Sequence, residues 1–246
     1  VTYSDEPPSP KTEEQDHNRL LVLNPKPFIS PQQEYLYKVL VADIARLRGN
    51  NLLAAKYFLE VATMVQDSQL AERATQAAWN AKQYQMAMEA ARLWVTLTPN
   101  NSKARQILGQ ILLHQQRPEE AVIHLNRWLN EFKDEPQKQG EIIEALLEQQ
   151  QEPTKALEFM SQLVAKQPAD PTRLFIYARL LLNDNQVDKA QEVLQSLLDI
   201  VPDHAQAVSL YIYSLDRQNQ HEQALQWLKQ LLSKHPKQWD WRLMYA

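Results

Sequence analysis

An alanine recurs along this sequence at an almost constant interval, and it brings the same neighbours with it. The residues four and seven places after it are large and apolar in most copies, and in four copies a proline stands twelve places after it. Successive alanines are 33, 34, 35, 34 and 34 residues apart. A period of about 34 residues predicts an array of helix–turn–helix repeats. The six anchor alanines are Ala54, Ala87, Ala121, Ala156, Ala190 and Ala224.

The spacing within each copy predicts a helix that is packed along one face. Offsets of zero, four and seven residues lie on the same side of an α-helix. The alanine allows another helix to come close, and the larger residues fill the space beyond it. Proline ends this helix, because it cannot continue a helix and disfavours helical geometry in the residue before it. A preceding helix is indicated by a large and a small residue upstream, as Leu108 and Gly109 stand before Ala121.

This pattern, from about residue 34 to residue 246, resembles the tetratricopeptide repeat (TPR). The resemblance implies an all-α fold, namely a right-handed α-solenoid of about six repeats plus the first helix of a seventh. A non-repeating helical bundle is the alternative. Residues 242–246 echo residues 173–178, which suggests that the chain stops inside the seventh repeat and is the N-terminal part of a longer array. The alternative is that residues 239–246 form a short terminal cap.

The first 32 residues differ from the rest and predict a separate region. They hold six of the fourteen prolines, among acidic and polar residues, which is typical of an extended tether. The apolar residues 20–23, with Phe28 and Ile29, predict a strip that docks on the first repeat; a partner-binding motif is the alternative. We therefore expect a tether at 1–32, partly docked on the first repeat, and a solenoid at 33–246.

Local signals place several elements. Ser30 before Pro31 suits a helix N-cap, and Gly49 predicts the turn to a second helix at about residues 52–65. The region of residues 134–136 replaces the usual turn before the fourth repeat, whose spacing is one residue longer. Trp94 and Trp128 occupy the apolar position seven places after an anchor alanine, where we expect them to fill the core between helices.

Signatures of enzymes are missing from the sequence. The two glycine-rich phosphate-binding motifs, G-x-x-x-x-G-K-[ST] and G-x-G-x-x-G, do not occur in the sequence. The H-E-x-x-H zinc motif and the G-x-S-x-G turn around a serine nucleophile are also absent from it. No two of the six histidines are three or four residues apart, so no helical pair of imidazoles is available for a metal. The chain has no cysteine. We expect a non-enzymatic protein with no cofactor and no metal.

Composition narrows the choice of partners. A net charge of −4 does not attract nucleic acid, and no apolar run reaches the roughly 20 residues of a membrane span. The first residue is Val1, so a signal peptide or a lipidated cysteine would lie upstream of this sequence.

Function is therefore expected on a surface, and in TPR arrays the first helices line the concave face. Acidic and basic side chains are equally frequent at these positions, which suits a polypeptide better than a phosphate backbone. Aromatic residues at these positions are candidate anchors for a partner, although Phe175 is as easily explained by packing between helices. The candidate partner-binding residues are Asp43, Arg46, Glu72, Gln76, Trp79, Asn80, Lys103, Gln106, Gln110, His114, Glu141, Arg179, Asn183, Tyr213, Asp216 and Arg217.

A narrower resemblance concerns residues 34–101. The residues 40–42, 48–50, 66–67 and 70–74 make this part similar to the N-terminal repeats of proteobacterial TPR lipoproteins of the outer membrane. One type of member is an adaptor that brings substrates to a carboxyl-terminal processing protease. The resemblance implies a periplasmic scaffold with a possible lipid anchor upstream, and a protease and its substrates as partners.

Other interpretations stay open. One is a cytoplasmic TPR module in a regulatory or assembly complex, and another is a TPR segment of an envelope polysaccharide synthesis or secretion system. Self-association is a further possibility, because an incomplete seventh repeat would expose apolar residues. The chaperone-binding carboxylate clamp of some TPR domains is disfavoured, since no repeat has both its lysine and its asparagine.

Overall fold

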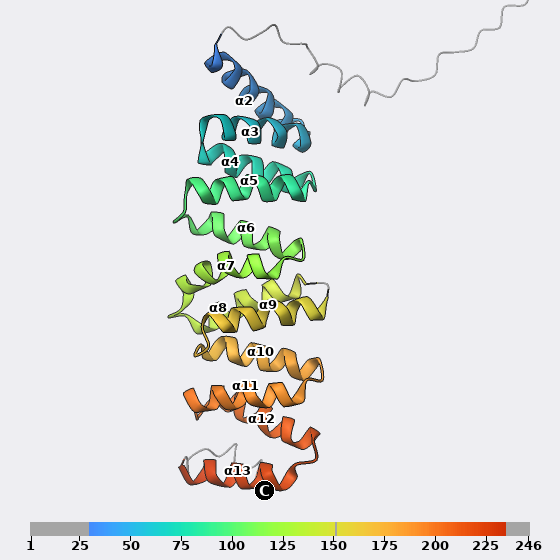
Figure 1. Ribbon diagram of the computed structural model, residues 1–246, viewed down its shortest axis with the longest axis vertical. Helices are drawn as coiled ribbons and strands as arrows, with labels where there is room; N and C mark the ends of the chain where they lie inside the picture. Colours follow the sequence, from blue (N-terminus) through green and yellow to red (C-terminus); the bar gives the residue numbers. More distant parts are fainter. Residues whose placement is uncertain (1–29, 151, 235–246) are drawn as a thin grey trace, which may run out of the picture. The chain divides into compact units, whose positions relative to one another are not determined.

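The computed structural model describes residues 30–150 and 152–234, and in these residues the regular structure is entirely helical (Figure 1). Twelve α-helices and one short 3-10 helix follow one another along the described chain. They are α2 (Pro31–Leu47), α3 (Asn51–Val65), α4 (Ser68–Asn80), α5 (Tyr84–Leu97), α6 (Ser102–His114), α7 (Pro118–Leu129), η1 (Asn130–Phe132), α8 (Pro136–Glu148), α9 (Pro153–Lys166), α10 (Pro171–Asn183), α11 (Val187–Ile200), α12 (Ala205–Arg217) and α13 (His221–Lys234).

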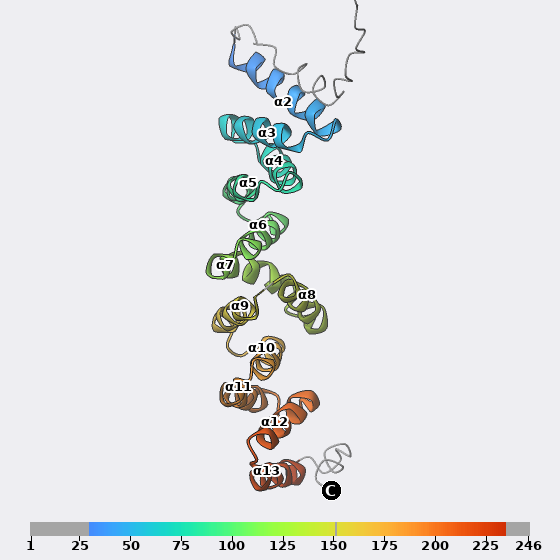
Figure 2. The same cartoon turned by 90° about the vertical axis from the view of Figure 1, so that its right-hand side faces the viewer.

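The chain divides into two compact units, Val1–Thr98 and Pro99–Ala246. In the first unit, α2 pairs with α3 and α4 pairs with α5. In the second unit the first helices α6, α8 and α10 lie on one side, and the second helices α7, α9 and α11 lie on the other (Figure 2). The all-α fold made of successive helix pairs, predicted from the 34-residue period, is therefore confirmed.

The six anchor alanines are all buried, as their spacing predicts. Four of them have no exposed surface, while Ala156 and Ala224 expose 7% and 9%. The residue seven places later is buried in five repeats, but Trp128 is only half-buried. The prediction for Trp128 was wrong in this respect: the neighbouring Leu129 is fully buried there, and Trp128 packs edge-on against Phe132 at 6.0 Å.

Gly109 shows how closely two helices of one repeat approach. A Cβ atom added to this residue of α6 would lie 2.5 Å from Cγ of Leu125 in α7. Only hydrogen fits in that space, so the large-then-small pair before the anchor alanine has a steric reason.

Side chains and prolines define where the helices begin. Ser30 accepts a hydrogen bond from the backbone N–H of Gln33, as the predicted cap should, and Asn101 caps α6 in the same way by accepting from the N–H of Ala104. Five helices start with proline at their first position, where the missing N–H costs no hydrogen bond. Because α2 begins at Pro31, the last two residues assigned to the tether belong to the first helix.

The turn within a repeat depends on one residue in the left-handed conformation. In five repeats this residue lies five places before the anchor alanine, and the N–H of the next residue donates to the carbonyl five places further back, at 2.8–3.0 Å. This arrangement closes the end of the first helix. The residues with positive φ at this position are Gly49, Lys82, Gln116, Asn185 and Asn219.

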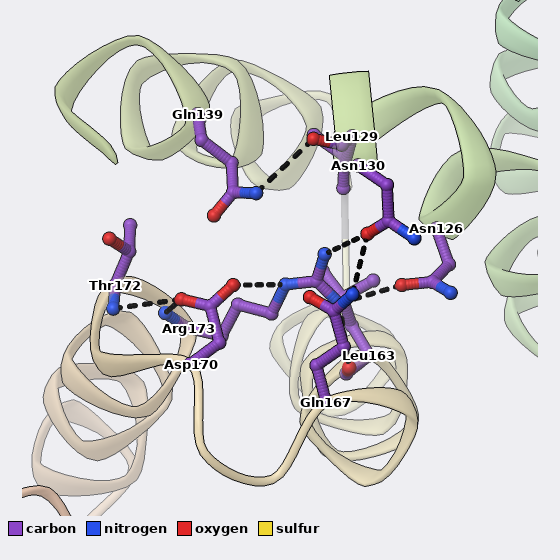
Figure 3. Close-up of polar contacts among 9 residues, drawn as sticks. All are labelled: Asn126, Leu129, Asn130, Gln139, Leu163, Gln167, Asp170, Thr172 and Arg173. Atoms are coloured by element: carbon purple, nitrogen blue, oxygen red, sulfur yellow. Dashed lines mark hydrogen bonds and ion pairs between the residues drawn. The ribbon is translucent and has the colours of Figure 1, made fainter. Parts of the chain in front are cut away.

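A buried arginine links the third, fourth and fifth repeats (Figure 3). Arg173 on α10 has no exposed surface. Its Nη1 donates to Oδ1 of Asn126 on α7 at 2.7 Å and to the carbonyl oxygen of Leu163 on α9 at 3.2 Å. Nη2 donates to Oδ1 of Asn130 at 3.2 Å. One guanidinium thus joins three successive repeats.

A carboxylate compensates the charge of this arginine. Nε of Arg173 lies 2.9 Å from Oδ2 of Asp170, an ion pair in which the N–H direction departs from good hydrogen-bond geometry. Burial lowers the pKa of Arg173, and Asp170 acts in the opposite direction. Oδ1 of Asp170 also caps α10 by accepting from the N–H groups of Thr172 and Arg173.

Carboxamides complete the cluster. Gln167 donates to Oδ1 of Asn130 at 2.7 Å, and Gln139 of α8, itself buried, donates to the carbonyl oxygen of Leu129 at 3.2 Å. The fourth repeat, which has the irregular spacing, is therefore held to its neighbours by polar contacts as well as by apolar packing.

Two predicted regions lie outside the described residues. They are the greater part of the tether, residues 1–29, and the start of a seventh repeat within residues 235–246. Both stay predictions.

The left-handed turns lead to a first prediction. Lys82 has φ 56°, which costs a residue with a side chain about 1 kcal/mol relative to glycine. Lys82→Gly should therefore raise the midpoint of thermal unfolding followed by circular dichroism. Gly49→Ala, at the same turn position with φ 78°, should lower it. A lower midpoint for Lys82→Gly would contradict this explanation of the turns.

The buried arginine leads to a second prediction. Arg173→Met keeps most of the side-chain volume but leaves Asp170 without its cation, so we expect a loss of about 3 kcal/mol in stability. The matched control is Arg179→Met on the same helix, which breaks an exposed ion pair with Glu144 and should cost less than about 1 kcal/mol. Thermal and denaturant unfolding of both variants measure the difference; equal small losses would show that the cluster does not stabilise the repeats.

Candidate functional site

Six of the predicted partner-binding residues belong to the first unit, on α2 and α4. Arg46, Gln76 and Asn80 are exposed, whereas Asp43 and Glu72 are half-buried. Trp79 exposes 39% of its surface, and its ring makes an edge-on contact with Tyr84 at 5.3 Å. Within this unit the two first helices therefore do present these side chains at the surface.

Three of these residues surround one hollow of about 510 Å³. Its wall comes from the end of α2, the beginning of α3 and one face of α4. We call it the arginine hollow, and its lining residues are Arg46, Asn51, Arg73, Gln76, Ala77 and Asn80. Arg73 and Asn51 were not among the predicted site residues.

The two guanidinium groups of the arginine hollow share one carboxylate. Arg73 forms an ion pair with Oδ1 of Asp43, and Nη2 of Arg46 lies 3.8 Å from the same oxygen. Two positive charges thus meet one negative charge. Because both arginines are partly exposed, an anion from outside has access to them.

The guanidinium of Arg73 also stacks on the ring of Phe58. Its guanidinium carbon lies 4.5 Å from the centre of the Phe58 ring, which has no exposed surface. Stacking on an aromatic face and pairing with Asp43 fix the orientation of the planar group. The repeat pattern alone does not identify Arg73 as a surface residue of this site.

In the second unit, the candidates of α6 and α8 are dispersed along their helices. Lys103 and His114 are exposed at opposite ends of α6, with Gln106 and Gln110 half-buried between them. Glu141 is exposed on α8 and accepts a hydrogen bond from Gln137 at 3.2 Å. No hollow described in the second unit is lined by these five residues.

The candidates of α10 and α12 take part in links between neighbouring repeats. Arg179 pairs with Glu144 of α8 and lies 6.0 Å from the ring of Phe175. Arg217 donates to the carbonyl oxygen of Leu182 at 3.3 Å and to Oδ1 of Asn185. These arginines therefore hold one repeat against the next, a role that the predicted list did not consider.

The remaining candidates of the second unit are exposed. Asn183 lies at the end of α10, and Oδ1 of Asp216 lies 2.8 Å from Nδ1 of His221 at an exposed position. Tyr213 exposes 51% of its surface, and the guanidinium of Arg217 lies 5.9 Å from its ring. Phe175, by contrast, is half-buried and stacks on His204 at 5.2 Å, which supports the packing interpretation.

A second hollow, of about 770 Å³, lies at the loops between repeats of the second unit. It adjoins the Arg173 cluster, because Gln139, Gln167 and Asp170 belong to both. Most of the exposed lining is apolar, and it includes Pro168 and Ala169 of the loop at 167–170. Sequence reasoning had placed no candidate in this loop.

Residues 30–150 and 152–234 present neither a metal-binding cluster of side chains nor a helix suited to span a membrane. No group of three or more histidine, cysteine or acidic side chains is arranged to hold a metal ion in this part of the chain. Among the helices described, none combines the length and the apolar character that crossing a membrane requires.

Comparisons with known proteins give similarities of several kinds. A TPR repeat-containing protein of Pseudomonas aeruginosa is 26% identical over 226 residues, which cover 90% of this chain and 37% of that protein. The chain thus spans little more than a third of the length of this relative. The solved structure of PilW, described as a widely conserved type IV pilus biogenesis factor, is 15% identical with a TM-score of 0.38, covering 87% of this chain and 99% of that one.

A further solved structure is that of YrrB, described as a TPR protein with an unusual peptide-binding site. It is 13% identical with a TM-score of 0.32, and the similarity covers 85% of this chain and 90% of that one. Two family models described as tetratricopeptide repeat match residues 76–136 and 147–211, together slightly more than half of the sequence. This chain belongs to the tetratricopeptide-repeat family.

Proposed function

We propose that the chain is a non-enzymatic scaffold that binds polypeptide partners, and that the arginine hollow of the first unit is a contact point for an acidic group of the partner. The observation that carries this proposal is the pair of partly exposed guanidiniums around a single carboxylate. The family supports the first part, since its repeats serve as surfaces for protein or peptide partners.

The charge of the hollow favours a carboxylate as its ligand. Arg46 is held only loosely by Asp43, at 3.8 Å, because Arg73 already pairs with the same oxygen. A guanidinium presents parallel N–H groups that match the two oxygens of a carboxylate. An aspartate or glutamate side chain, or a terminal carboxylate, would satisfy Arg46 without displacing Arg73.

The other lining residues suit the backbone of a polypeptide. Asn51, Gln76 and Asn80 each offer a carbonyl acceptor and an amide donor at the same surface. Carboxamides of this kind pair with peptide N–H and C=O groups whatever the side chains of the partner are. Two arginines against one aspartate are too few charges to hold a nucleic acid backbone, whose affinity grows with the number of neutralised phosphates.

Exposed aromatic residues add possible anchors in each unit. Trp79 follows Gln76 by one helical turn on α4, and Tyr213 is exposed on α12. Large aromatic side chains often dominate the binding energy of protein interfaces. Their positions on helices, rather than on loops, keep them in fixed directions before a partner arrives.

A more specific proposal concerns the cellular location of the chain and the identity of its partner. The likeness of residues 34–101 to periplasmic TPR lipoproteins supports a scaffold of the bacterial periplasm that brings substrates to a carboxyl-terminal processing protease. The relative that is 26% identical supports a bacterial repeat protein, and its name states only the repeats. Fractionation of the source cells with an antibody to this chain tests the location, and recovery in the cytosol would contradict it.

Peptide binding tests the arginine hollow directly. Fluorescently labelled peptides that contain glutamate should bind more tightly than the same peptides with glutamine, as measured by fluorescence anisotropy. Arg46→Gln should weaken the binding of the acidic peptides by about tenfold to a hundredfold, because a charged hydrogen bond contributes about 1.5–3 kcal/mol. Arg46 is the better position to change, since Arg73→Gln would also remove the closer ion-pair partner of Asp43.

The matched control is Lys56→Gln, which makes the same change of charge at an exposed position of α3 that does not line the hollow. This variant should bind like the unchanged chain. Equal affinity for glutamate and glutamine peptides, or equal weakening by Arg46→Gln and Lys56→Gln, would contradict a specific carboxylate site.

A further inference from the structure

Exposed apolar side chains are concentrated in the first repeat. Among the described residues, six of the eleven large hydrophobic side chains that are exposed belong to α2 and α3. Three leucines of α2 are the most exposed, with Leu36 at 63%, Leu40 at 60% and Leu47 at 77%. A patch of this kind marks a surface that another segment or molecule covers.

The three leucines form one stripe along α2. At about 100° per residue, they lie within an arc of about 40°. The opposite side of the helix carries the buried residues Val41, Ala42 and Ala45, which face α3. A helix that is apolar on two opposite sides is typical of a position between two neighbours. We call Leu36, Leu40 and Leu47 the leucine stripe.

Three other first helices have such a second neighbour, namely α4, α10 and α12. In the first unit α4 packs between α3 and α5, and in the second unit α10 packs between α9 and α11. Within the described residues, α2 has its main contact with α3 alone. The leucine stripe therefore lies on the side of α2 away from α3, its main neighbour among the described helices.

We propose that residues 20–29 of this same chain bind along the leucine stripe in an extended conformation and close the end of the repeat array. This segment directly precedes the N-cap Ser30 and contains the apolar residues Leu20, Leu21, Val22, Leu23, Phe28 and Ile29. Pro25 and Pro27 lie between the two apolar groups, and proline biases the residue before it toward an extended backbone.

Residues 22–28 in an extended conformation span about the same distance from Ser30 as residues 36–47 do along α2. At about 1.5 Å per helical residue, Leu36 and Leu47 lie about 9 and 25 Å along α2 from Ser30. At about 3.3 Å per extended residue, Phe28 and Val22 lie about 7 and 26 Å along the chain from Ser30. A segment that turns back at Ser30 therefore brings Phe28 to Leu36 and Val22 to Leu47.

A hollow at the beginning of α2 provides space where the segment joins the helix. It measures about 470 Å³ and is lined by Pro31, Gln32, Tyr35, Met64, Val65 and Asp67. Met64 and Val65 are exposed there. The Phe28–Ile29 pair, two residues or fewer from Ser30, has the apolar character and the short tether that this hollow requires.

Cysteine cross-linking tests the proposed pairing, because the chain has no cysteine of its own. We expect the full chain with Val22→Cys and Leu47→Cys to form an intramolecular disulfide on mild oxidation, at a yield independent of protein concentration. Leu47 is exposed, so its replacement should not disturb folding. The matched control combines Val22→Cys with Leu225→Cys, an exposed leucine of α13, and should form no such bond.

Each other result overturns the proposal. A disulfide that appears only between two chains, and increases with concentration, would assign the leucine stripe to a second copy. No disulfide with Leu47→Cys, or an equal yield with Leu225→Cys, would show that the segment does not occupy the stripe. None of these readouts involves a partner peptide, so they are independent of the arginine hollow.

Hydrogen exchange of the full chain provides a second, non-covalent test. The double change Leu21→Asp and Leu23→Asp should release the segment and lower the protection of the α2 amides against exchange. Thr12→Asp, upstream of the apolar residues, should leave this protection unchanged. Unchanged protection in the double variant, or the same loss with Thr12→Asp, would contradict the proposal.

Discussion

The close approach of two helices at each anchor alanine is the constraint on which the rest of the structure depends. All six alanines are buried, and at Gly109 the space between α6 and α7 admits no Cβ atom. Small residues at these points bring the helix axes together, and the larger residues on either side then fill the core. Because the anchor alanine returns about every 34 residues, each helix pair presents equivalent faces, and side chains such as Arg46 reach the surface from first helices.

Much of this architecture was predictable from local signals, whereas contacts between distant residues were not. The anchor alanines and the caps Ser30 and Asn101 follow from periodicity and from the hydrogen bonds that helix ends require. The left-handed turns have a local signal at Gly49 and a weaker one at Asn185 and Asn219, whereas Lys82 gives no local sign of a positive φ. The role of Arg173 was missed, since its partner Asn126 is 47 residues away.

In the candidate site, too, some residues were predictable from the repeat pattern and others depend on contacts between distant residues. Periodicity identified Arg46, Gln76 and Asn80 as surface residues of the first helices, and they line the arginine hollow. It did not identify Arg73, which reaches the hollow by stacking on Phe58 and pairing with Asp43. Other charged candidates prove to connect neighbouring repeats, as Arg179 and Arg217 do. A charged position on a repeat surface can therefore stabilise the array, contact a partner, or do both.

The role of the anchor alanines is tested most directly by enlarging one of them. Thermal unfolding of Ala190→Leu, at a fully buried anchor of α11, should be compared with that of Ala145→Leu, at an exposed position of α8. The account predicts that Ala190→Leu loses about 1–3 kcal/mol through overpacking, and that Ala145→Leu stays within about 0.5 kcal/mol of the unchanged chain. Equal unfolding midpoints for the two variants would contradict it.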